Sequence, residues 1–208
     1  MKIGTVEYAG TVVDPAAPPP GPLPQVAFSG RSNVGKSSLI NTLLRRTRAK
    51  IARVSATPGK TQALNFYRVN DRFFLVDLPG YGFARVPQGT RDAWAGLIEG
   101  YLAGSRHLRG VVHLVDARHT PTKHDRQMVA YLAGVGVPAL IVMNKMDKLS
   151  RSERRKALDR AAETLDVEEA QLLAFSSKTG EGRDELLEAI ESLIDTEAEV
   201  ATDGGQGA

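Results

Sequence analysis

Residues 30–37 read Gly-Arg-Ser-Asn-Val-Gly-Lys-Ser, and this stretch decides the fold. It matches the pattern G-x-x-x-x-G-K-[ST], in which glycines let backbone N–H groups turn inward around a phosphate chain. A strand-like apolar run precedes the loop, and a helical pattern from Ser37 to Arg45 follows it, so the positive end of the helix faces the phosphates. In such loops Lys36 reaches the β- and γ-phosphates, and the Ser37 hydroxyl ligates Mg²⁺. The stretch predicts a phosphate-binding loop between a strand and a helix.

Short β-type runs alternate with helical patterns along the rest of the chain. The expected strands cover residues 26–29, 63–69, 72–77, 110–116, 139–144 and 171–176. The expected helices cover residues 37–45, 91–103, 124–133, 151–165 and 183–194. This alternation predicts an α/β fold with a six-stranded, mostly parallel sheet, one antiparallel strand at the Asn70-Asp71 turn, and helices on both faces. Ser150 and Glu153 have the spacing of a capping box.

Length and composition indicate one globular domain with two extensions. The chain has 208 residues, 42% of them apolar and 25% charged. A proline cluster ends residues 1–24, which we expect to form an extended arm rather than a helix or a central strand. The nucleotide-binding domain is expected at residues 25–194. Residues 195–208 are acidic and glycine-rich, so we expect them to be a disordered tail.

The composition also excludes several function classes. The chain has no cysteine, which excludes disulfides, thiolate metal sites and cysteine nucleophiles and fits a reducing compartment. The longest apolar stretch, Val135 to Met143, has nine residues, whereas a membrane span needs about 20. The N-terminus lacks the pattern of a signal or transit peptide. We therefore expect a cytoplasmic monomer that does not insert into a membrane.

Positive charge is concentrated in one part of the chain. The formal net charge is +3. Four acidic residues lie in the last fourteen, so the rest of the chain is more basic than this value suggests. Between Pro15 and Asn70 the sequence has nine Lys or Arg residues and no Asp or Glu. A block of one sign favours a polyanionic partner such as RNA, and the alternative is a solvated basic face.

A second motif, Asp77-Leu-Pro-Gly80, ends the second strand of the expected hairpin. In this position the aspartate can hold Mg²⁺ through water, and the Gly80 N–H can contact a γ-phosphate. Asp and Gly are common in turns, so this motif alone would not indicate a nucleotide site. It does so because it follows a strand downstream of the phosphate loop.

Two further motifs indicate the base. Asn144-Lys-Met-Asp147 follows an apolar strand, at the end of the sheet where open α/β folds bind ligands. A carboxylate there can accept hydrogen bonds from N1–H and the 2-amino group of guanine, a donor pair that adenine lacks. Ser176-Ser-Lys178 ends the next strand, where a backbone N–H can contact the guanine O6. The combination predicts GTP rather than ATP.

Two residues bear on the rate of hydrolysis. Asn33, the fourth residue of the phosphate loop, faces the space between the α- and γ-phosphates, where its oxygen could ligate a monovalent cation such as K⁺. The alternative is that asparagine merely tolerates the backbone of the loop. Tyr81 stands where Ras-type enzymes carry the glutamine that orients water, so intrinsic hydrolysis is expected to be slow.

Histidine and aromatic residues outside the motifs are expected to be structural. The four histidines show no metal-ligand spacing, and His113 lies inside an expected strand as a satisfied interior or edge residue. Trp94 and Tyr101, seven residues apart on an expected helix, are expected to pack in the core.

Six segments together resemble a known family. They are Gly30 to Ser38, Thr57 to Gln62, Asn65 to Tyr67, Asp77 to Ala84, Asn144 to Asp147 and Ser176 to Gly180. Over residues 24–194 the chain resembles the EngB (YihA/YsxC) GTPases of the TrmE-Era-EngA-YihA-septin class, and Pro79 to Ala84 is the most specific piece. The resemblance implies a P-loop NTPase fold of the Ras-like G-domain type.

The resemblance also implies a function. Thr61 becomes the switch I threonine that ligates Mg²⁺ in the GTP state, and Thr57 to Lys60 become a mobile loop beside the nucleotide. The family is associated with assembly of the large ribosomal subunit, hence with rRNA and ribosomal proteins as partners, and with normal septation in cell division. The alternative is a non-catalytic GTP/GDP-sensing adaptor at the division site. Era-, EngA- and TrmE-like proteins need an additional domain, which about fourteen residues after the last expected helix do not supply.

The expected site combines the motif residues with those that the resemblance implies. The expected catalytic residues are Lys36, Thr61, Gly80 and Asn33, and the expected Mg²⁺ ligands are Ser37, Thr61 and Asp77. The expected nucleotide contacts are Gly30, Arg31, Ser32, Asn33, Val34, Gly35, Lys36, Ser37, Ser38, Thr57, Pro58, Gly59, Lys60, Thr61, Asp77, Leu78, Pro79, Gly80, Asn144, Lys145, Met146, Asp147, Ser176, Ser177 and Lys178.

Overall fold

The computed structural model describes residues 1–14, 17, 19–45, 63–81 and 88–203, with side chains for all of these except 88–94 and 196–203. In chain order its strands are β1 (Val6–Val12), β2 (Gln25–Gly30), β3 (Leu64–Val69), β4 (Phe73–Asp77), β5 (Leu108–Asp116), β6 (Ala139–Asn144) and β7 (Leu172–Ala174). Its α-helices are α1 (Lys36–Leu43), α2 (Gln88–Gly104), α3 (Lys123–Gly134), α4 (Arg151–Leu165) and α5 (Arg183–Asp203). Short 3₁₀ turns cover Met146–Lys148 and Glu169–Gln171.

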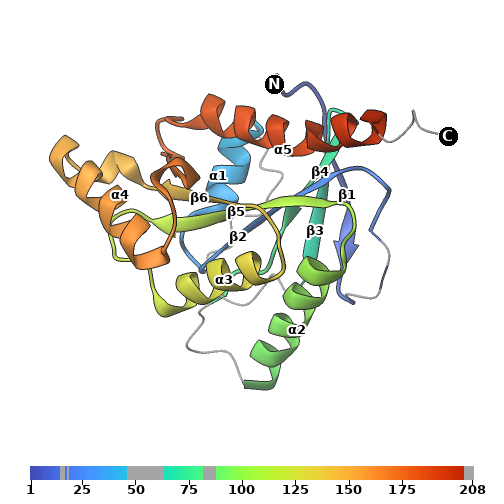
Figure 1. The fold of residues 1–208 in the computed structure, drawn as a ribbon, viewed down its shortest axis with the longest axis horizontal. Coiled ribbons are helices and arrows are strands. Elements are labelled where there is room, and N and C mark those ends of the chain that lie inside the picture. Colours follow the sequence, from blue (N-terminus) through green and yellow to red (C-terminus); the bar gives the residue numbers. More distant parts are fainter. Residues whose placement is uncertain (15–16, 18, 46–62, 82–87, 204–208) are drawn as a thin grey trace.

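The seven strands form one sheet in the order β1-β3-β4-β2-β5-β6-β7 (Figure 1). Strands β4, β2, β5, β6 and β7 run parallel, and β3 is antiparallel to both of its neighbours, β1 and β4. The predicted α/β class is therefore confirmed. Because the carboxyl ends of parallel strands share one edge of a sheet, the loops after β2, β4, β5 and β6 lie together.

Helices cover both faces of the sheet, so the central parallel strands are buried on both sides. On one face Val26 and Phe28 of β2 pack in the same apolar cluster as residues of α1 and α5. On the other face Ala27 packs in a cluster with residues of α2 and α3. Figure 1 shows these two helix pairs on opposite sides of the sheet, with α4 beside the β6 end. No described helix is long and apolar enough to span a membrane.

The sheet has seven strands rather than the predicted six because β1 adds to its edge. Its residues pair with β3 from Val6↔Val69 to Val12↔Leu64, and the register shifts between Tyr8 and Gly10. This irregularity breaks the two-residue alternation by which a strand is recognised in sequence. The proline cluster lies after β1 rather than within it, so it did not interfere with pairing.

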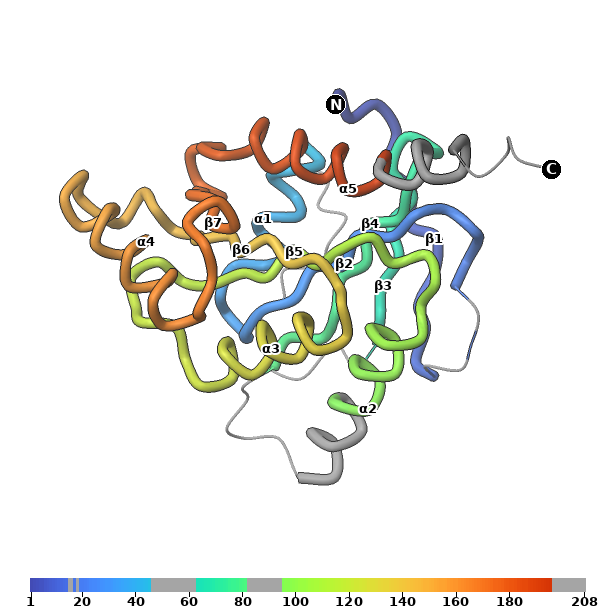
Figure 2. Tube along the Cα trace, in the orientation of Figure 1, coloured from blue at the N-terminus to red at the C-terminus, as the bar shows by residue number. Residues whose placement is uncertain are grey.

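The first residues of the chain are tied to the rest of the fold. The Asn70 amide oxygen accepts hydrogen bonds from the N–H groups of Gly4 (2.8 Å) and Thr5 (3.1 Å), and its nitrogen donates to the Lys2 carbonyl. The Met1 ammonium lies 2.8 Å from the Glu191 carboxylate of α5. Figure 2 shows the N-terminus beside the middle of α5.

Helix α5 continues to Asp203, nine residues beyond the predicted end at Ile194. The helix therefore extends through residue 203, over residues that we expected to form a disordered tail. The physical reason is that residues 195–203 contain no glycine or proline, and the helix breakers begin with Gly204-Gly205. Residues 204–208 lie outside the described part of the chain. The other helices match their predicted ranges within a few residues, and the Glu153 carboxylate accepts from the Ser150 N–H at 2.8 Å, as the capping box requires.

Candidate nucleotide-binding site

The phosphate loop has the backbone that the glycine pattern requires. Gly35 has φ 99° and caps α1, and a Cβ added there would lie 2.5 Å from the Asn144 Nδ2 atom. Asn33 has φ 65°, in the left-handed region that asparagine tolerates. The Val34 N–H donates to the Arg31 carbonyl at 3.2 Å, which tightens the loop. The loop therefore presents the N-terminus of α1 at the carboxyl edge of the sheet.

Lys36 and Asp77 form a buried ion pair beneath this loop. The Lys36 Nζ atom donates to the Asp77 Oδ1 atom, and both side chains are less than a tenth exposed. Asp77 is the last residue of β4, next to β2 in the sheet, while Lys36 opens α1. The structure thus joins two predicted motifs that lie 41 residues apart in the sequence.

Gly80 lies against the phosphate loop. A Cβ on Gly80 would lie 3.0 Å from the Ser32 hydroxyl oxygen, so a larger residue would press on the loop. The Ser32 N–H donates to the Tyr81 carbonyl at 2.9 Å, and Arg31 and Tyr81 form a parallel bridge. The Ser32 hydroxyl itself is buried without a hydrogen-bond partner among the described residues. This orphaned polar atom in the loop is the kind of group that a phosphate oxygen would satisfy.

Asn144 braces the loop from β6. Its Nδ2 atom donates to the Val34 carbonyl at 3.0 Å, while its Oδ1 atom accepts from the Ser177 N–H at 3.3 Å and hydroxyl at 3.2 Å. Asn144 is 1% exposed. One amide therefore connects the phosphate loop with the Ser176-Ser-Lys178 motif.

Lys145 makes a second connection to the loop. Its Nζ atom donates to the Asn33 carbonyl at 2.9 Å and lies 2.8 Å from the Asp116 carboxylate. The Arg118 guanidinium also donates to Asp116, with contacts of 2.9 and 2.7 Å. Although partial burial would raise the pKa of Asp116, the hydrogen bonds from Arg118 and Lys145 hold it well below its usual range. Asp116 thus remains charged and holds both cations in place.

Asp147, the residue predicted to contact the base, is held by the Ser176 hydroxyl. Its Oδ1 atom accepts from the Ser176 hydroxyl at 2.8 Å, and this bond is the main cause of a lowered Asp147 pKa. The Ser176 oxygen in turn accepts from the N–H groups of Lys178 (3.3 Å) and Thr179 (3.2 Å). The carboxylate is therefore ionised and oriented, with a second oxygen available, as contacts to the two guanine donors require.

These contacts bring four predicted motifs to one edge of the sheet. The remaining predicted segment, Thr57, Pro58, Gly59, Lys60 and Thr61, lies outside the described residues. Its roles, and the Mg²⁺ role of Thr61, stay predictions.

The residues present fit Mg²⁺. Magnesium prefers oxygen ligands and is usually held by one or two carboxylates together with substrate phosphates. Asp77 supplies a buried carboxylate beside the loop, and Ser37 supplies a hydroxyl in the first turn of α1. Both would hold the ion next to the phosphates.

Sequence comparison identifies the family to which the chain belongs. Residues 25–145 match the family model described as a 50S ribosome-binding GTPase, and residues 98–196 match that of the elongation factor Tu GTP-binding domain. A probable GTP-binding protein EngB of Halothermothrix orenii is 48% identical over 94% of this chain and 98% of its own length. Another from Syntrophus aciditrophicus is 50% identical over 91% of this chain and 95% of its own. The chain belongs to the EngB family of GTPases.

Solved structures agree with the EngB fold. A probable GTP-binding protein EngB superposes with a TM-score of 0.70 over 83% of this chain and 99% of its own, at 24% identity. An Era variant of Aquifex aeolicus bound to GDP and aluminium fluoride gives a TM-score of 0.66 over 83% of this chain and 57% of its own, at 21% identity. At these identities the likeness concerns the fold alone.

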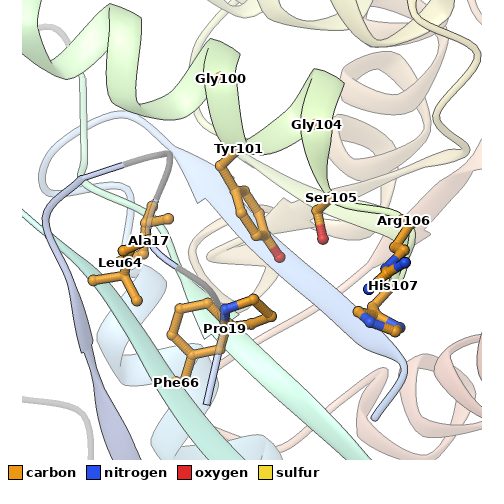
Figure 3. Close-up of a pocket in the computed structure, with 11 residues that line it drawn as sticks. Ala17, Pro19, Leu64, Phe66, Gly100, Tyr101, Gly104, Ser105, Arg106 and His107 are labelled. Carbon is orange, nitrogen blue, oxygen red and sulfur yellow. The ribbon is translucent and has the colours of Figure 1, made fainter. Parts of the chain in front are cut away.

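Two described cavities differ in their relation to the EngB motifs. One, of about 200 Å³, is lined by Arg31 to Val34 together with Asp116, Arg118 and Lys145, and belongs to the nucleotide site. The other, of about 310 Å³, lies between α2 and the β1–β3 edge, where Tyr101 and Phe66 line it (Figure 3). None of the nucleotide motifs contributes a residue to this second cavity.

Sequence reasoning missed Asp116 and Arg118, although both belong to the site. The available signal was position, because Asp116 ends β5 beside Asn144 at the same sheet edge as Asp77. His113 and Tyr101 were correctly assigned to the interior, at 0% and 6% exposure. The side chain of Trp94 lies outside the described part of the structure.

Proposed function

We propose that this EngB-family chain is a Mg²⁺-dependent GTPase whose GTP-bound state acts as a switch in assembly of the large ribosomal subunit. We further propose that it acts in the cytoplasm and is needed for normal cell division and septation. The observation that carries the GTPase part is the convergence of the Lys36–Asp77 pair and the oriented Asp147 carboxylate at one sheet edge. The match to a family described as 50S ribosome-binding supports the ribosomal part.

One group of residues would bind the phosphates, and another would bind the guanine base. Loop N–H groups and Lys36 would hold the β- and γ-phosphates, because both present positive charge at the start of α1. The Gly80 N–H would contact the γ-phosphate, and Asp147 would select guanine. When bound, Mg²⁺ neutralises charge on the β- and γ-oxygens; Ser37, Asp77 and Thr61 would be its protein ligands.

Co-sedimentation with purified ribosomal subunits tests the switch. With a non-hydrolysable GTP analogue the protein should bind the large subunit or its precursor, and with GDP binding should weaken. The affinity should fall steeply as KCl rises, because basic groups that contact rRNA release counterions on binding. Equal binding with both nucleotides contradicts the switch, and binding that does not depend on salt contradicts an rRNA contact.

A further inference from the structure

A buried chain of hydrogen bonds connects the strand before the phosphate loop with the residue after Gly80. The Tyr81 hydroxyl donates to the Asp125 Oδ1 atom of α3 at 2.7 Å and lies 3.2 Å from the His113 Nε2 atom of β5. The His113 Nδ1 atom lies 2.8 Å from the hydroxyl oxygen of Ser29, the penultimate residue of β2. The Tyr81 and His113 rings are parallel, with centroids 6.1 Å apart. His113, Ser29 and Asp125 are each at most 2% exposed.

The chemistry of the groups fixes the direction of each bond. Burial raises the pKa of Tyr81, and the nearby His113 ring together with hydrogen bonds from Thr122 and Tyr81 keeps the Asp125 pKa low despite burial. The Tyr81 phenol is therefore protonated and the Asp125 carboxylate is charged. The Tyr81 hydroxyl donates its hydrogen bond to Asp125. The tyrosine oxygen therefore acts as an acceptor for the His113 Nε2–H group. In the neutral imidazole with its proton on Nε2, the Nδ1 atom accepts from the Ser29 hydroxyl. The chain runs Ser29 to His113 to Tyr81 to Asp125.

This arrangement turns the Tyr81 side chain into the protein and fastens the segment around Gly80. The phenol lies between β5 and α3, where it cannot orient a water molecule at a γ-phosphate. The Tyr81 carbonyl meanwhile accepts from the Ser32 N–H, so the residue is held at both its backbone and its side chain. Gly80 is therefore kept in contact with the phosphate loop.

We propose that Tyr81 is a positioning residue, whose hydroxyl, bound to Asp125 and His113, holds Gly80 in place for the γ-phosphate. This inference rests on the proposed GTPase function. The Asp125 carboxylate serves two purposes, because its Oδ2 atom accepts from the Thr122 N–H at the start of α3. Asp125 therefore connects the start of α3 with the Tyr81 hydroxyl.

The test compares affinities for GDP and for a non-hydrolysable GTP analogue in a double-mutant cycle. Tyr81→Phe should weaken analogue binding about tenfold, as expected for loss of a hydrogen bond to a charged group, and leave GDP binding unchanged. Asp125→Asn keeps an oxygen for the helix cap but places a donor opposite the phenol, and should have the same effect. The double variant should be no worse than either single variant, because both remove one interaction.

Tyr101→Phe is the matched control. Its hydroxyl also makes a buried bond, to Gln25 at 2.8 Å, away from the nucleotide motifs. This variant should lower thermal stability without changing the ratio of the two affinities. Additive effects of Tyr81→Phe and Asp125→Asn, or an unchanged ratio in a wild-type protein that binds both nucleotides, would overturn the positioning role. Failure of the wild type to bind either nucleotide would instead overturn the proposed function.

Discussion

At the scale of single residues, we predict that the preference for guanine depends on Asp147. Asp147→Asn should lower GTP affinity about tenfold or more and favour xanthosine triphosphate, because the new amide places a donor opposite the guanine 2-amino group. Competition between the two nucleotides for the purified protein measures the effect. Asp184→Asn is a suitable control, since this carboxylate is 81% exposed on α5. If the Asp147→Asn variant still preferred guanine nucleotides, Asp147 would not be the residue that selects the base.

Asp116 should make the free energy of unfolding depend on pH in the acidic range. Its pKa is held below its ordinary value by hydrogen bonds that outweigh burial, so its contribution is fully present above an unfolded pKa of about 3.9 and is lost as pH falls through the folded value. Urea unfolding of wild type and Asp116→Asn should show a constant difference in unfolding free energy near neutral pH. That difference should shrink below about pH 4. A difference that stays the same down to pH 2 to 3 contradicts this role.

Asn33 offers a test of cation dependence. Its positive φ is a sufficient structural reason for asparagine, so a cation role requires evidence from turnover. With Tyr81 turned inward, intrinsic hydrolysis should be slow, on the order of 10⁻⁴–10⁻³ per second by analogy with unassisted Ras. If the Asn33 oxygen holds K⁺, turnover should be faster in KCl than in NaCl at equal ionic strength, and Asn33→Ala should remove the difference while GDP binding survives. Equal wild-type rates in both salts would leave Asn33 as a loop residue only.

At the scale of elements, the Asn70 side chain fastens the residues that lead into β1. Asn70→Gly keeps the left-handed backbone but removes the bonds to Gly4, Thr5 and Lys2, and should destabilise the protein by about 1–3 kcal/mol. Hydrogen exchange of the β1 amides should accelerate more than that of β5. As a control, Asn65→Ala removes the bond from the Thr11 hydroxyl, which is the one side-chain bond of Asn65 among the described residues, and should have a smaller effect. Uniform acceleration across the sheet would show that β1 does not open separately.

Sequence predicted the elements best where periodicity and local signals agreed. β6 and α4 match their predicted limits, because an unbroken apolar run and a capping box mark them. β1 was missed because its bulge interrupts the alternation, and α5 was cut short because its acidic end was grouped with the glycines that follow. The motif residues were predictable since each follows a strand. The partners of Tyr81 were not, because His113, Asp125 and Ser29 come from three separate elements that only the fold brings together.

At the scale of the whole molecule, phosphate and base recognition lie along one edge of a single sheet. The phosphate loop follows β2, the Asp77 motif follows β4, and the base-recognition motif follows β6, with β5 between. Side chains connect these neighbouring loops directly: Lys36 contacts Asp77, and Asn144 and Lys145 contact the phosphate loop. β1 is the outermost strand of the sheet on the β3 side, and β3 separates it from β4.

The brace from Asn144 and Lys145 to the phosphate loop limits how this protein could be engineered. These two residues donate to the carbonyl groups of Val34 and Asn33, so the segment that leads to the base-selecting Asp147 also supports the phosphate grip. A designer who replaced residues 144–147 with a segment suited to another base would alter the shape of the loop as well. Nucleotide identity and nucleotide affinity are thus not separate design variables here. A change of base that also replaced Asn144 or Lys145 would need a compensating substitution in the loop itself.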